Sequence, residues 1–74
     1  MSLSIMVEVF KTNIHKIKQA KKVLIILSQH FPSCKINFDL KDCDRVLRVE
    51  GHQLCIQKII EILHLNGFQC QALE

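Results

Sequence analysis

The sequence is poor in glycine, proline and aromatic residues, and it has no long hydrophobic run. Its 74 residues include two glycines, one proline and four phenylalanines, with no tryptophan or tyrosine. The two glycines, Gly51 and Gly67, form no glycine-rich phosphate loop. The longest unbroken apolar run, residues 23–27, is far shorter than the roughly 20 residues that span a bilayer. We therefore expect no phosphate-binding loop of this kind and no membrane segment.

Charge of neither sign dominates the composition. Ten Lys and Arg against seven Asp and Glu leave a formal net charge of +3, which is small for a dedicated nucleic-acid binder. Hydrophobic residues make up 49% of the chain, which argues against intrinsic disorder. The length predicts a single domain over residues 4–73, with residues 1–3 an appended remnant or a disordered start. Because the start has no secretory signal, we expect a cytoplasmic protein.

The four cysteines are spread along the chain without a CxxC pair. In the absence of a secretory signal, we expect free thiols rather than disulfides. Cys43 lies in a polar turn and is expected to be exposed. Cys34 and Cys70 are interpreted as strand residues, and Cys70 is expected to face the core.

Apolar periodicity predicts six secondary-structure elements. Asn13 is a suitable N-cap for the first helix, and Pro32 limits how far that helix can extend. Asn66 and Gly67 tolerate the left-handed conformation that ends a helix, so they mark the end of the second one. The predicted elements are a strand over 5–10, a helix from Asn13 to between 29 and 31, strands over 35–40 and 45–50 joined by a turn at 42–44, a helix over 54–63, and a strand over 68–73.

This order is typical of an α+β, ferredoxin-like βαββαβ two-layer sandwich. Right-handed crossovers predict an antiparallel sheet in the order 4-1-3-2, with both helices on one face and the other face open. The predicted core is Ile5, Val7, Val9, Ile17, Leu24, Leu27, Ile36, Phe38, Leu47, Val49, Ile59 and Leu63.

Several stretches together resemble the heavy-metal-associated domain family, which includes copper chaperones and the N-terminal domains of metal-transporting ATPases. The resemblance extends from about residue 4 to residue 73. It rests on Val7-Glu8-Val9-Phe10-Lys11-Thr12-Asn13, Ile36-x-Phe38-Asp39-Leu40, Val46-Leu47-Arg48-Val49 and Ile59-x3-Leu63-x3-Gly67-Phe68.

The family binds Cu(I) or Zn(II) through a Met-x-Cys-x-x-Cys loop before the first helix. In this sequence the resemblance aligns that loop with Thr12, Asn13, His15 and Lys16, and it places Asn13 and Lys16 where the two cysteines stand. A lysine ammonium has no lone pair for a metal, and an amide is a poor ligand for a soft cation. The metal loop is therefore degenerate, and the family's metal transfer is not carried over.

Two pairs of residues remain as candidate metal ligands elsewhere. In the family's fold the end of the second helix lies beside the first loop, so His64 could approach His15. His52 and Cys55 have a spacing that places two ligands on one face of a helical turn. Exposed histidines and a buried apolar thiol at Cys55 are the commoner interpretations, because a structural zinc site needs four ligands.

The sequence offers no constellation for catalysis. Its serines suggest no arrangement with a histidine and an acid. An acylphosphatase-like enzyme shares the fold, but it needs an anion loop with an arginine, and the first loop here is Lys11-Thr12-Asn13. The lysines of the first helix are interpreted mainly as a solvated face, and no aromatic platform for RNA is expected on the open sheet face. We expect a protein that is not an enzyme.

Two functional hypotheses remain. The first is a non-enzymatic binding module without a cofactor that contacts an unidentified protein or a second copy of itself, and neither nucleic acid nor a membrane. Its partner face is predicted to contain Met6, Phe10, Val46 and Leu73 of the open sheet face. The alternative is a carrier of copper or zinc that uses Cys and His outside the usual loop.

Overall fold

The structure is a computed structural model that describes residues 4–41, 43 and 45–73. The expectation about residues 1–3 lies outside this range, as do Asp42 and Asp44 of the predicted turn. The described residues form six elements in the predicted order. They are β1 (Met6–Thr12), α1 (Ile17–His30), β2 (Lys35–Asp39), β3 (Val46–Gly51), α2 (Ile56–Leu65) and β4 (Cys70–Ala72).

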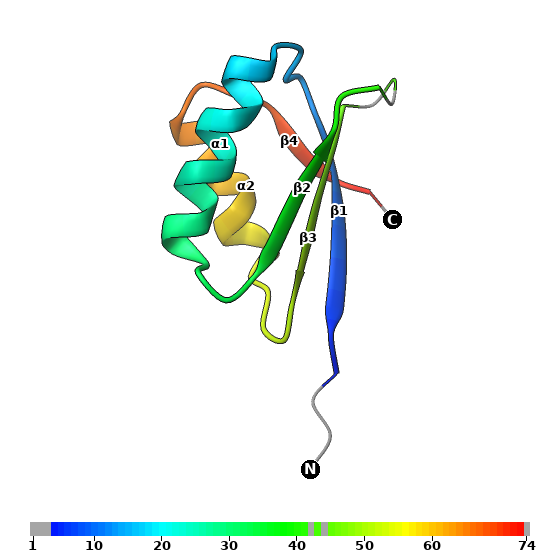
Figure 1. Cartoon of the computed structure of the whole chain (residues 1–74), viewed down its shortest axis with the longest axis vertical. Coiled ribbons are helices and arrows are strands. Elements are labelled where there is room, and N and C mark those ends of the chain that lie inside the picture. The colour runs from blue at the N-terminus through cyan, green and yellow to red at the C-terminus, as the bar shows by residue number, and fades with distance from the viewer. Residues whose placement is uncertain (1–3, 42, 44, 74) are drawn as a thin grey trace.

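The strands form one antiparallel sheet in the order β2-β3-β1-β4, which reads β4-β1-β3-β2 from the opposite edge. Both helices lie on the same side of this sheet, so the molecule has one helix layer and one sheet layer (Figure 1). The chain is therefore an α+β domain of two layers, and the second face of the sheet carries no helix.

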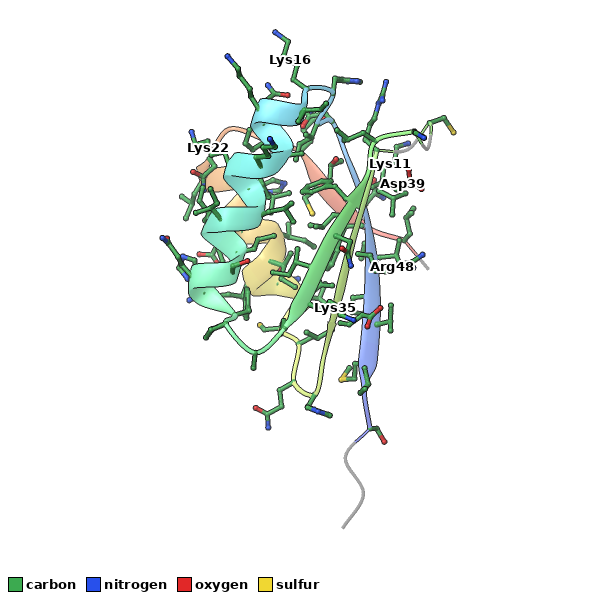
Figure 2. The ribbon with its side chains drawn as sticks, in the orientation of Figure 1. Lys11, Lys16, Lys22, Lys35, Asp39 and Arg48 are labelled. Atoms are coloured by element: carbon green, nitrogen blue, oxygen red, sulfur yellow. The ribbon has the colours of Figure 1, made fainter. Side chains whose placement is uncertain are left out.

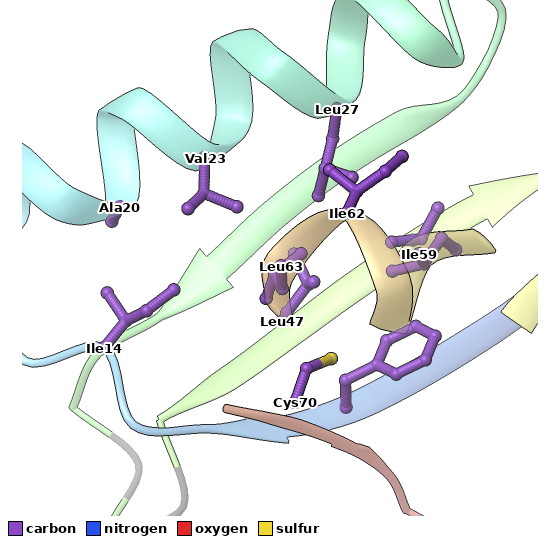
Figure 3. Packing of buried hydrophobic residues seen from close by; sticks show 11 residues of the cluster. Ile14, Ala20, Val23, Leu27, Leu47, Ile59, Ile62, Leu63 and Cys70 are labelled. Carbon is purple, nitrogen blue, oxygen red and sulfur yellow. The ribbon is translucent and has the colours of Figure 1, made fainter. Parts of the chain in front are cut away.

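The hydrophobic core lies between the two layers. Figure 3 shows side chains of both helices pointing toward those of the strands. Phe10 of β1 and Leu47 of β3 are directly opposite each other in the register, and both are fully buried. The buried cluster consists of Phe10, Ile14, Ala20, Val23, Leu27, Leu47, Val49, Ile59, Ile62, Leu63 and Cys70.

The predicted orientation of β1 is wrong. Ile5 and Val7 were expected in the core, but their side chains are 65% and 50% exposed, and Val9 lies on the same side of the strand. Phe10 was expected on the open face and is fully buried instead. Both sets of alternating positions in β1 carry apolar side chains, so alternation alone does not reveal which set meets the helices. The structure buries the set that contains the largest side chain.

The predicted core is otherwise correct in part. Five predicted core residues are fully buried, two pack partly against the cluster, and two helix residues lie elsewhere. Ile17 is 66% exposed because it occupies the first turn of α1, and Leu24 is only half-buried. The fully buried residues are Leu27, Leu47, Val49, Ile59 and Leu63, and the partly buried ones are Ile36 and Phe38.

The first helix begins later than predicted. Asn13 was expected to cap it, but α1 starts at Ile17 and the preceding residues form a loop. Ile14 is fully buried in that loop, so the chain must pass the core before it can turn into the helix. The side-chain oxygen of Gln19 accepts hydrogen bonds from the amides of His15 and Lys16, both at 3.4 Å. These two amides directly precede α1, so Gln19 provides them with a hydrogen-bond acceptor.

The helix ends follow the predicted signals. α1 ends at His30, just before Phe31 and Pro32, as expected. At the end of α2, the amide of Gly67 donates to the carbonyl of His64 at 3.0 Å, and the amide of Phe68 donates to that of Leu63 at 2.9 Å. This pair of bonds is the Schellman motif, which requires the positive φ of 86° that Gly67 adopts.

Candidate functional site

The sheet has a face without helices, and its residues follow from the register. Residues paired across antiparallel strands point to the same side of the sheet. Leu73 joins this surface because its amide donates to the carbonyl of Val9 at 2.8 Å. We call the surface the open face. It consists of Val7, Val9, Lys11, Lys35, Asn37, Asp39, Val46, Arg48, Glu50, Gln71 and Leu73.

Apolar side chains form the middle of the open face. Val7 is 50% exposed and Leu73 is 37% exposed, while Val9 and Val46 are half-buried. A hollow of about 410 Å³ lies beside the last three of these residues, lined by Phe38 and by the open-face residues Val9, Asn37, Asp39, Val46, Arg48 and Leu73. Apolar side chains from strands that are distant in the sequence thus meet at one surface, which is typical of a contact site rather than of scattered exposed residues.

Charged side chains lie beside these apolar residues on the open face. Lys35 and Asp39 stand at the two ends of β2, and Arg48 lies between them on β3 (Figure 2). Lys35 and Glu50 are directly paired across β2 and β3. Within the described part of the chain, none of Lys35, Arg48 and Glu50 makes an ion pair. Asp39 accepts one hydrogen bond, from the amide of Lys41 at 3.1 Å.

The predicted partner face is corrected by this geometry. Val46 and Leu73 lie on the open face, as the sequence suggested. Phe10 does not, because its ring is buried in the core. Met6 alternates with Phe10 on the helix side of β1, where it is paired with Gly51 and is 42% exposed. Sequence reasoning missed Val7 and Val9, which take the place that Phe10 and Met6 were expected to fill.

The loop that resembles a degenerate metal site is held by hydrogen bonds. The hydroxyl of Thr12 donates to the carbonyl of Arg45 at 2.6 Å and accepts from the amide of Ile14 at 3.2 Å. The side-chain oxygen of Asn13 accepts from the amide of Gln69 at 2.9 Å. Both polar side chains therefore stabilise the loop, and Asn13 ties it to the segment before β4.

His15 and His64 line the same depression beside this loop. It has a volume of about 390 Å³, and Cys43 also lines it. Both imidazoles are exposed. Among residues 4–41, 43 and 45–73, no group of three or more His, Cys, Asp and Glu side chains is placed to hold a metal ion. The predicted approach of His64 to His15 is thus limited to a shared depression.

The second candidate pair is also exposed. His52 Nδ1 lies 3.3 Å from the carbonyl oxygen of Ser4, and Cys55 precedes the first residue of α2. The interpretation of Cys55 as a buried apolar thiol is wrong, because its side chain is exposed at the helix start. Neither residue belongs to a metal-binding group within the described ranges.

The thiols otherwise differ strongly in their surroundings. All four are free. Cys43 is exposed and Cys70 is buried, as predicted, and burial raises the pKa of the Cys70 thiol to about 12. Cys34 is half-buried just before β2 rather than within it. It lies so close to Gly51 that a Cβ atom there would come within 2.6 Å of its sulfur.

The outer surface of α1 is basic. Lys18, Lys21 and Lys22 are exposed, and the helix contains no Asp or Glu. Ile17 and Ile25 are exposed on the same helix, at 66% and 60%. The outer surface of α1 and the open face therefore carry different patterns, since the open face has charged residues of both signs and α1 has no acidic residue.

No family model matches the chain, and no curated protein or solved structure matches it. No helix within the described residues has the length and apolar character needed to cross a membrane.

Proposed function

We propose that the chain is a ferredoxin-like, non-enzymatic binding module that contacts protein through the open face. The observation that carries this proposal is the grouping of Val7, Val9, Val46 and Leu73 on one side of the sheet, where the last three line a hollow of about 410 Å³. Exposed apolar side chains that share one surface and are rimmed by polar residues are characteristic of protein contact sites.

The state of the first loop supports protein contact rather than metal transfer. We propose that the domain is related in architecture to heavy-metal-associated domains but has lost their metal chemistry. Asn13 uses its side-chain oxygen to fix the loop to Gln69, and Lys16 presents an ammonium group. A loop with these groups serves the fold, because it connects β1 to α1 and seats Ile14 in the core.

Site-specific photo-crosslinking tests the proposal, because it traps whichever protein lies against a chosen position. A photoreactive residue is placed at Asn37, in the middle of the edge strand β2 on the open face, and a second variant carries it at Lys22 on α1 as a matched control. We expect discrete adducts from position 37 in the cells that express the protein, and we expect Val9→Glu to abolish them. An absence of adducts from position 37, or the same adducts from both positions, would show that the open face is not the contact surface.

A further inference from the structure

The two ends of β2 carry opposite charges on the open face. Lys35 is the first residue of the strand and Asp39 the last. The register pairs Lys35 with Glu50 and Asp39 with Val46, so both project from the side without helices. A separation of four residues places their Cα atoms about 13 Å apart. Lys35 makes no ion pair among the described residues, so its charge is available to a partner.

One row of residues crosses the sheet between these charges, and it is polar at the β2 edge and apolar toward the β4 edge. Val9 and Leu73 continue the middle row of the face, which begins with Asn37 and Arg48. This row therefore divides the open face into two halves. One half has Lys35 at its β2 corner, and the other has Asp39 there.

The β2 edge of a surface with this division is complementary to itself. A two-fold axis that runs across the strands, along the middle row, exchanges the two halves of the face. Lys35 of each copy then lies opposite Asp39 of the other, which gives two equivalent ion pairs. Val9 and Leu73 meet their own counterparts near the axis. The two Arg48 side chains also approach one another there. The same operation places Glu50 of each copy opposite Val46 of the other, and Lys11 opposite Val7.

The outer surface of α1 is a poorer surface for a second copy. α1 presents Lys18, Lys21 and Lys22 without an acidic residue, so two such surfaces repel each other. The exposed Ile17 and Ile25 lie within this basic surface. Of these two surfaces, only the open face carries charges of both signs.

We propose that the occupant of the open face is a second copy of this chain, packed face to face about a two-fold axis that crosses the strands. This inference rests on the proposed function and names its partner. Four strands about 4.8 Å apart, with lengths of three to seven residues, make a face of at most roughly 20 by 17 Å. An interface of this size belongs to the small class below about 1,200 Å² in total, which is typical of weak and transient contacts.

A charge exchange tests the pairing of Lys35 with Asp39. Sedimentation equilibrium at protein concentrations from about 10 μM to 1 mM measures the dimer dissociation constant of the parent and three variants. Lys35→Asp and Asp39→Lys each replace both ion pairs with like-charge contacts, so each should weaken the dimer about tenfold. The double variant K35D/D39K restores opposite charges across the axis and should return the constant to that of the parent.

Lys22→Asp serves as the matched control, because it makes the same change of charge on α1 and should leave dimerisation unaltered. The positions are exposed, and circular dichroism establishes that each variant is folded. A parent that stays monomeric at 1 mM, single variants that dimerise like the parent, or a double variant as weak as the single ones would each overturn the inference. Crosslinks from position 37 to a different protein would also overturn it while leaving the proposed function intact.

Discussion

Because the orientation of β1 is reversed, substitutions at two neighbouring residues should lower the free energy of unfolding by very different amounts. Phe10 is fully buried and Val9 is half-buried on the open face. Folding removes the whole Phe10 side chain from water, roughly 200 Å², which contributes up to about 5 kcal/mol at 25 cal/mol per Å². Phe10→Ala should therefore lower the free energy of unfolding by about 3–5 kcal/mol. A domain of this length has only about 4–11 kcal/mol in total.

Urea denaturation measures this difference. Because Phe10→Ala approaches the whole stability of the domain, Phe10→Leu provides a milder variant with an expected loss of about 1–2 kcal/mol. Val9→Ala should cost less than about 1 kcal/mol when measured in dilute protein, where self-association adds nothing. A larger loss for Val9→Ala than for Phe10→Leu would refute the assignment of these side chains to the two faces of the sheet.

Three further predictions follow from the loop, the thiols and the close approach at Gly51. Asn13→Cys combined with Lys16→Cys should create affinity for Cu(I) and Zn(II), because two thiolates would lie close to the start of α1. A competition titration measures this affinity, and the matched double substitution to Ser should create none. Burial raises the pKa of Cys70 to about 12 from 9.0, so between these pH values the unfolded chain binds fewer protons than the folded one and stability falls as pH rises. Urea titrations at pH 9 and pH 11 should show less of this alkaline loss in Cys70→Ala, and an identical loss in both proteins would contradict it. Gly51→Ala should lower the free energy of unfolding by about 1–3 kcal/mol, because its Cβ would meet the sulfur of Cys34 at 2.6 Å. Thermal denaturation measures this loss, and adding Cys34→Ala should recover much of it in the double variant.

Local signals predicted the element ends well where one residue type decides the geometry. Pro32 stops α1 nearby because the residue before a proline avoids the helical conformation. Gly67 ends α2 because its positive φ completes the hydrogen bonds to His64 and Leu63. Both effects act within a few residues of the chain, so the sequence alone contains them.

The parts that failed depend on contacts between distant segments. β1 has apolar side chains on both faces, and only its pairing of Phe10 with Leu47 determines which one lies under the helices. Asn13 had the chemistry of a helix cap, but its side chain bonds to the amide of Gln69, which is distant in the sequence. Alternation correctly placed Val46 and Leu73 on the open face, because polar residues occupy alternate positions of their strands. The placement of Val7 and Val9 depends on the register of the whole sheet, because both faces of β1 carry apolar residues.

Nuclear magnetic resonance during dilution tests binding through the open face most directly. Amide resonances of the parent are followed from about 1 mM to 10 μM, together with those of K35D/D39K and Asp39→Lys. We predict that dilution shifts the amide resonances of open-face residues and leaves those of α1 unchanged. The first set is Val7, Val9, Arg48 and Leu73, and the second is Lys18, Lys21 and Lys22. Asp39→Lys should suppress the shifts, and the double variant should recover them. Shifts confined to the helix layer, or none at any position up to 1 mM, would contradict a self-complementary open face.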